Sequence, residues 1–183
     1  MRFPILFLLL IAYFSAHAQD STQYLAVQSC MISGPVFLQK PFISDSTNIF
    51  GDKYDVKQML KTKISPIAFK RDAYTANFDT VTGYFTIAHA PTDRTSFYFF
   101  NFTVTAKSFA KAKLKVSSQH AVEIYIDDKK VTDKQSIQKN IDKASSADWP
   151  MTLEPHSYNI SVKCLLQAND SLPPAIRKSC NVG

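Results

Sequence analysis

Apolar and polar residues alternate along residues 111–131, and this pattern is the strongest structural signal in the chain. From 111 to 117 every second position is apolar, and lysine or serine stands between. A second alternation covers residues 121–127. A period of two buries one face of a strand and leaves the other in water, as in an antiparallel sandwich. Asp127 and Asp128 then mark a tight turn, because short acidic side chains tolerate positive φ.

An aromatic run follows the same rhythm at residues 97–105. Tyr98 and Phe100 share one face of the expected strand, whereas Phe97 and Phe99 share the other. An aromatic stripe at this spacing predicts core packing rather than a ligand platform. Because aromatic residues occupy both sides, part of each face of this strand should be covered.

Turn residues divide the rest of the chain into further short strands. Gly83 separates the run 78–81 from the run 84–87, which predicts a hairpin. Pro155 is expected at the turn between two later strands, since proline removes a ladder donor. Residues 132–148 are polar and predict a loop or a single helical turn.

Together these signals predict an all-β chain of roughly seven or eight strands, folded as an antiparallel β-sandwich or jelly roll with one short helix. The expected divisions are a signal peptide at 1–18, an irregular leader packed on the sandwich at 19–75, the β-sandwich domain at 76–170, and a linker or truncated tail at 171–183.

The amino terminus has the features of an export signal. Arg2 precedes an apolar stretch at 5–14, and a small-x-small site ends at Ala18. We expect cleavage between Ala18 and Gln19, and export to the periplasm, the cell surface or the medium. The apolar run is shorter than the roughly 20 residues of a spanning helix, and no later segment approaches that length. No transmembrane helix is expected after signal removal.

The net charge of +6 at pH 7 raises the question of an anionic partner. Most lysines fall on the wet side of expected strands or in short linkers: Lys111, Lys113, Lys115, Lys129, Lys130 and Lys134. This distribution favours a solvated face over a designed polyanion site, and no nucleic-acid partner is expected.

The chain has 3 cysteines, and an odd count leaves at least one without an intramolecular partner. Cys164 continues an alternating run and is expected to be a small buried group. Cys30 and Cys180 are the candidates for a disulfide, although the sequence alone does not choose the ends of a bridge.

Catalytic motifs are missing from the sequence, which has no Gly-x-Ser-x-Gly, His-Glu-x-x-His, Cys-x-x-Cys or phosphate-binding glycine loop. No catalytic residue, cofactor or metal is therefore predicted. Three isolated histidines close to expected turns are interpreted as surface residues: His89, His120 and His156. Asp127, Asp128 and Asp133 carry the oxygens that calcium prefers, but they lack EF-hand spacing and turn formation explains them better.

Two aromatic residues are candidates for ligand contact. Trp149 is the only tryptophan and follows the polar loop, from which its ring would stack on a sugar or on an apolar partner. Tyr125 points away from the apolar face of its expected strand. Packing of Trp149 on its own sandwich is the alternative.

Two stretches, KAKLKVSSQHAVEIYIDDKKV and MTLEPHSYNISVKCL, resemble the sugar-binding jelly-roll or galactose-binding-like modules beside catalytic domains in exported glycosidases and peptidases. Such modules often end a strand with a Val-Tyr-Val-Asn-Gly-Lys-like hairpin, and Asp128 stands here in the place of the glycine. The resemblance implies a non-catalytic module that contacts carbohydrate or a neighbouring domain.

A second resemblance covers residues 25–176 and begins with SGPVFLQKPF and DSTNIFGDKYDVKQML. These segments are similar to the amino-terminal all-β region of large secreted Bacteroides-type proteins. Such proteins carry a TolB-like propeller and a prolyl-oligopeptidase-like or amidohydrolase-like domain. No matching position is catalytic in that family.

The sequence supports three functional hypotheses. The first is a non-catalytic exported accessory or binding module that contacts carbohydrate or a partner domain. The second is a truncated amino-terminal fragment of a secreted multidomain serine peptidase or related hydrolase. The third is a structural domain for protein–protein interaction through its sheet edges.

Overall fold

The computed structural model describes residues 25–38, 55–64, 73–87, 94–138, 144–167 and 180–182, the last three through their backbone alone. The expected signal peptide and His89 lie outside these ranges. Among the described residues, no helix has the length and apolarity of a membrane span.

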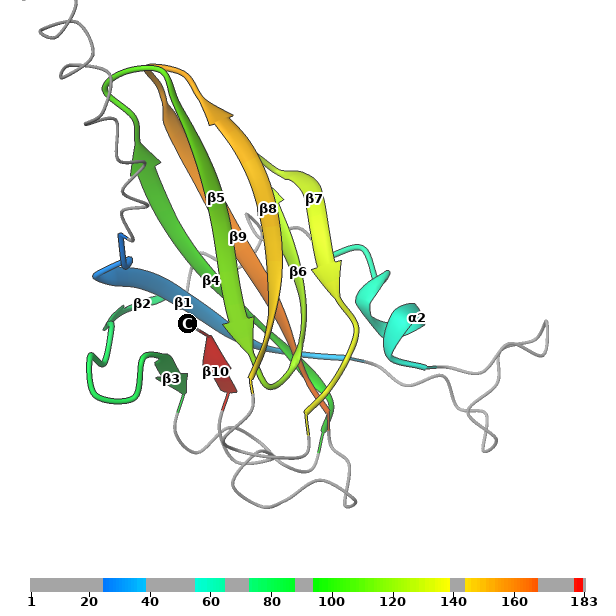
Figure 1. Ribbon diagram of the computed structural model, residues 1–183. Coiled ribbons are helices and arrows are strands. Elements are labelled where there is room, and N and C mark those ends of the chain that lie inside the picture. The colour runs from blue at the N-terminus through cyan, green and yellow to red at the C-terminus, as the bar shows by residue number, and fades with distance from the viewer. Residues whose placement is uncertain are drawn as a thin grey trace, which may run out of the picture.

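Two antiparallel sheets build the described part of the chain (Figure 1). The larger sheet has the strand order β2 (Tyr74–Asn77), β1 (Ser29–Phe37), β4 (Ser96–Thr105), β9 (Ser157–Leu166), β6 (Ala121–Ile126) and β7 (Lys129–Lys134). The smaller sheet has the order β3 (Phe85–Ile87), β10 (Cys180–Val182), β5 (Ala110–Ser118) and β8 (Ser145–Leu153). The predicted all-β antiparallel sandwich is confirmed.

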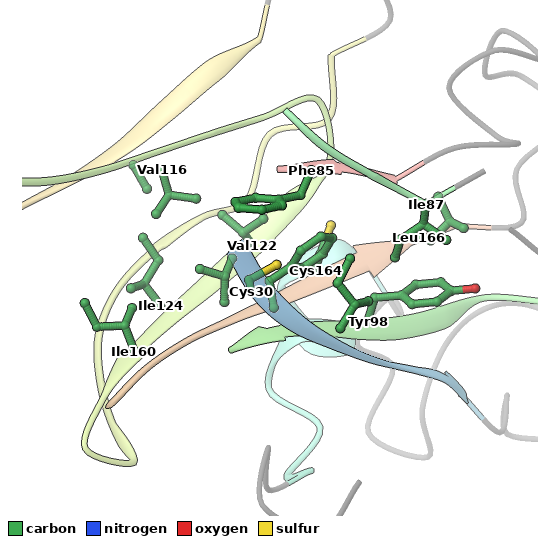
Figure 2. Packing of buried hydrophobic residues seen from close by; sticks show 14 residues of the cluster. Cys30, Phe85, Ile87, Tyr98, Val116, Val122, Ile124, Ile160, Cys164 and Leu166 are labelled. Carbon is green, nitrogen blue, oxygen red and sulfur yellow. The ribbon is translucent and has the colours of Figure 1, made fainter. Parts of the chain in front are cut away.

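The main core lies between the two sheets (Figure 2). Val116 of β5 and Ala147 of β8 enter it from the smaller sheet. The larger sheet contributes every second residue of its central strands: Tyr98, Phe100, Val122, Ile124, Ile160, Val162, Cys164 and Leu166. These are the apolar positions of the alternating pattern, so the period of two places the core correctly.

A second apolar cluster covers the opposite face of the larger sheet. Phe97 and Phe99 lie there, fully buried, against Met59 and Leu60 of the short helix α2 (Val56–Leu60). Asp55 caps this helix by accepting a hydrogen bond from the Gln58 amide at 2.9 Å. The prediction that part of each face of β4 is covered is confirmed, and the larger sheet is the middle layer of three.

The acidic turn forms as predicted between β6 and β7. Asp127 and Asp128 have φ values of 48° and 64°, the left-handed conformation that a two-residue hairpin with right-handed twist requires. The Asp127 carboxylate also accepts a hydrogen bond from the Asn159 amide at 2.9 Å. Turn formation therefore accounts for this acidic pair.

The bend predicted at Gly83 is present: Gly83 has φ of 75°, and the Asp79 amide donates to the Tyr84 carbonyl at 3.2 Å. The hairpin extends no further than the single bridge Asp79–Tyr84, since β2 pairs with β1 and β3 pairs with β10 in the other sheet. The loop predicted at 132–148 was wrong at both ends, because residues 132–134 belong to β7 and residues 145–148 belong to β8, which pairs with β5. Polar residues are compatible with a strand at this position because β8 lies at the edge of its sheet. An edge strand also accommodates Pro150, which has no backbone N–H to donate.

The amino-terminal leader contributes more than irregular chain. Its strand β1 lies between β2 and β4 in the larger sheet. Gly34 interrupts the regular register at the bulge between Ser33 and Val36. A Cβ atom at Gly34 would lie 2.7 Å from the Phe97 carbonyl oxygen, and the residue has φ of 126°, so only glycine fits there.

Candidate functional site

A buried ion pair lies beneath α2 on the larger sheet. Glu123 of β6 and Lys163 of β9 are cross-strand partners, and Lys163 Nζ lies 3.0 Å from Glu123 Oε2. Their side chains are only 3% and 1% exposed. Removing two charges from water costs several kcal/mol each, so such a pair persists only where further hydrogen bonds satisfy it.

Lys163 meets that requirement through α2. Its ammonium donates to the carbonyl oxygens of Leu60 at 2.6 Å and Thr62 at 2.9 Å, and it lies 4.6 Å from the centre of the Phe97 ring. Burial lowers the pKa of Lys163, while the hydrogen bond and charge of Glu123 act in the opposite direction. The three donors of the ammonium therefore fasten the end of α2 to the sheet.

Glu123 connects the buried pair to the surface. Its carboxylate accepts hydrogen bonds from Tyr125 Oη at 2.8 Å and from Lys130 Nζ at 2.7 Å. Lys130 also pairs with Asp133 at 2.6 Å. Burial, together with the hydrogen bond to Glu123, raises the pKa of Tyr125. These contacts form one network with a structural role, which contains Lys163, Glu123, Tyr125, Lys130 and Asp133. Within it, the carboxylate of Asp133 is engaged by Lys130.

The structure does not bring the two predicted contact residues together. Tyr125 lies on the α2 side of the larger sheet, with its hydroxyl engaged by Glu123. Trp149 lies in β8 rather than in a loop, half-buried and two residues from the buried Ala147. It therefore faces the space between the sheets. A ligand contact by either residue stays a prediction, but one site cannot contain both.

Two polar residues expected at the surface are buried. His120 is fully buried beside the end of β5, where its backbone amide donates to Ser118 Oγ at 3.1 Å. Lys134 is 7% exposed because its pairing with Val122 places it on the core side of β7. The polarity of these side chains concealed their inward positions. His156, in contrast, is exposed as predicted.

Lys134 leads to a prediction about pH. Burial lowers its pKa from 10.5 to about 8, and its ammonium donates to the Ser136 carbonyl at 2.9 Å. Below pH 8 the fold holds a poorly solvated charge. Between about pH 8 and 10.5 the unfolded chain binds more protons than the folded protein, so the contribution of Lys134 to stability rises with pH.

We therefore expect Lys134→Met to raise the free energy of unfolding at pH 7 by about 1–2 kcal/mol, after the lost Ser136 hydrogen bond is included. Urea titrations at pH 7, 9 and 10.5 should show this gain shrinking as the pH rises. Lys129→Met, at an exposed position of the same strand, is the control and should change little. A gain that is equal at all three pH values would show that Lys134 does not titrate in this window.

Cys164 lies where the alternating pattern placed it. Cys30 and Cys164 are buried in the core between the sheets, and burial raises the pKa of the Cys30 thiol to about 12. The side chain of Cys180 is outside the described residues. A bridge between Cys30 and Cys180 therefore stays a prediction.

Strands β5 and β8 of the smaller sheet present a charged surface to solvent, on the side that faces away from the core. We call it the β5 face and define it by Lys111, Lys113, Lys115 and Ser117 of β5 with Ser146, Asp148, Pro150 and Thr152 of β8. All but the half-buried Ser117 are exposed. Lys113 pairs with Asp148 at 2.6 Å, and this contact lowers the pKa of Asp148.

The β5 face ends at a tip formed by two turns. Phe109 precedes β5 and is 72% exposed. The Ala106 amide donates to the His156 carbonyl at 2.9 Å, which ties the turn before β5 to the turn before β9. The rings of His156 and Tyr158 also meet edge to face, with centroids 5.2 Å apart. Phe109 is thus an exposed ring beside two connected turns.

Sequence reasoning missed Glu123 and Lys163. Each occupies a polar position of an alternating strand, which normally means solvent. The available signal was the pair Phe97 and Phe99, whose burial requires a covering layer over the neighbouring strands as well. Among the described residues, no cluster of histidine, cysteine or acidic side chains has the arrangement of a metal site.

Comparison with known proteins finds no matching family model and no matching curated protein. Among solved structures, the GH31 alpha-xylosidase from Xanthomonas citri is 17% identical over 49% of this chain and 10% of its own, with a TM-score of 0.36. Beta-glucosidase from Kluyveromyces marxianus in complex with glucose is 14% identical over 51% and 10%, with a TM-score of 0.37. Its selenomethionine-labelled form is 11% identical over 90% and 18%, with a TM-score of 0.38.

This chain spans at most 18% of the length of those three structures.

Proposed function

We propose that this chain is a non-catalytic β-sandwich binding module of an exported protein, and that it contacts carbohydrate or a partner domain through the β5 face and its tip. The observation that carries the proposal is the exposed Phe109 ring beside a row of exposed lysines. Rigid sheets that present such groups on their surface and turns are a common basis of recognition.

The layering of the fold supports this choice of surface. One face of the larger sheet packs against the smaller sheet, and the other packs against α2 over the Glu123–Lys163 pair. The chain itself therefore occupies part of both faces. The outward side of β5 and β8 is free of such cover in the described structure (Figure 1).

A binding assay with the exported chain tests the proposal. Calorimetric titration with a panel of neutral and acidic polysaccharides and peptides should identify a ligand whose affinity falls several-fold in Phe109→Ala. Val81→Ala is the matched control, because Val81 is 93% exposed in a turn that joins the two sheets elsewhere. An absence of binding across the panel, or an equal loss in both variants, would contradict the proposal.

The same preparation tests the non-catalytic part of the proposal. We expect no peptidase or glycosidase turnover above the buffer blank. Sustained turnover that co-purifies with the chain through successive chromatographic steps would favour an enzyme instead.

The second part of the proposal is that this chain is a domain of a larger exported protein. It is supported by the resemblance of residues 25–176 to the all-β region that precedes propeller and hydrolase domains. Sequencing the DNA that follows codon 183 tests it. A continuation that encodes a propeller supports this part, whereas a stop codon without such coding sequence contradicts it.

A further inference from the structure

We infer that the β5 face binds a linear polysaccharide that carries carboxylate or sulfate groups, through Lys111, Lys113 and Lys115. This inference rests on the proposed binding function and names its ligand class. The sequence alone favoured a solvated face for these lysines. The structure adds their shared orientation, a rigid support and the identity of their neighbours.

The three lysines are evenly spaced along β5. Alternate residues on one strand point to the same side and lie about 7 Å apart, so the three lysines form a straight row. β5 pairs with β8 along its whole length, from Ala110–Leu153 to Ser118–Ser145. This pairing holds the backbone of the row fixed. A linear ligand with repeated charges can therefore engage several lysines at once without ordering the protein backbone.

The residues of β8 beside the lysines leave the β5 face with a net positive charge. On β8 the positions beside the lysine row are Ser146, Asp148, Pro150 and Thr152. Asp148 is the acidic residue among them, and it engages Lys113 at 2.6 Å. Three lysines against one aspartate leave the face positive. Charge of one sign on a surface attracts a ligand of the opposite sign, more strongly at low ionic strength.

The residues of the β5 face suit a saccharide better than a single-stranded nucleic acid. Nucleic acid sites of this kind stack successive bases on aromatic side chains along the groove. The β5 face has no aromatic member, because Trp149 belongs to the core side of β8. Instead, hydroxyl groups of Ser117, Ser146 and Thr152 border the lysines. Hydroxyl groups suit the hydrogen bonds of a sugar chain, and Phe109 at the tip offers one ring for stacking.

The test compares four probes and two triple variants of the exported chain by calorimetry at low salt. The probes are polygalacturonate, heparin, neutral dextran and a thymidine oligonucleotide. Lys111→Gln, Lys113→Gln and Lys115→Gln are combined in one variant. The control combines Lys57→Gln, Lys61→Gln and Lys129→Gln, which remove the same charge from exposed positions outside the β5 face.

We expect polygalacturonate or heparin to bind, and the two probes distinguish carboxylate from sulfate. The β5 variant should weaken binding about tenfold, and the control variant less than about threefold. Melting temperatures should stay equal, which shows that both variants fold. Binding should also weaken as salt is raised.

Other outcomes overturn the inference in distinguishable ways. Binding of dextran alone would retain the binding module but reject the anionic ligand. Tight binding of the oligonucleotide alone would assign the face to nucleic acid. Equal losses in both variants would reduce the effect to net charge. Binding of no probe, together with a failed polysaccharide and peptide panel, would contradict the binding function itself.

Discussion

Replacement of Lys163 by methionine is expected to lower the free energy of unfolding by about 3–5 kcal/mol. The substitution leaves Glu123 buried without its cross-strand partner, at a position where the carboxylate is 3% exposed. It also removes the donor to the carbonyl oxygens of Leu60 and Thr62. Buried acceptors that lose their donor cost more than the hydrogen bond itself contributed. Urea titration monitored by circular dichroism gives the value.

Two further variants assign this loss to the buried pair. Lys113→Met breaks the solvent-exposed pair with Asp148 and should leave the free energy of unfolding close to that of the wild type. Combining Lys163→Met with Glu123→Leu should recover part of the loss, because the buried carboxylate that lost its cross-strand partner is then also removed. A loss of the same small size in Lys163→Met and Lys113→Met would refute the role assigned to the buried pair.

Phe100→Ala is expected to have a comparable effect through the other layer, with a loss of about 3–5 kcal/mol. Phe100 is 1% exposed and packs in the core between the sheets, so its removal leaves a cavity there. Phe109→Ala removes the same atoms from a ring that is 72% exposed and should change stability by about 0.5 kcal/mol or less. The two unfolding midpoints can be measured side by side. Similar midpoints would mean that Phe100 is not a core residue.

The alternation of apolar residues predicted the part of the fold that depends on the period of two. It placed Phe100, Val122 and Ile124 on the core side and identified the double cover of β4 from Phe97 and Phe99. It also identified the β6–β7 turn from its two aspartates. These features follow from local chemistry, because one strand or turn contains all the residues that determine them.

The remaining features depend on partners far away in the sequence. Lys163 is buried because α2 lies over it, about a hundred residues earlier in the chain, and no local pattern reports that contact. Trp149 was assigned to a loop because its neighbours are polar, which an edge strand permits. Lys134 was expected in water, since only its register against Val122 shows that it points inward. The β5 face could not be predicted from the sequence, because half of its residues come from β8, whose pairing with β5 no local pattern shows.

Residue-resolved hydrogen exchange measures how far the cover on the two faces of the larger sheet stabilises its central strands. Amides of β4 and β9 should exchange only through global unfolding, with a free energy equal to that from urea titration. In Lys163→Met, the amides of Met59 in α2 and of its C-cap residue Lys61 should lose protection while β4 keeps its own relative protection. Exchange of β9 at the rate of an unfolded peptide, or α2 protection unchanged by the substitution, would contradict a stabilising role of this cover.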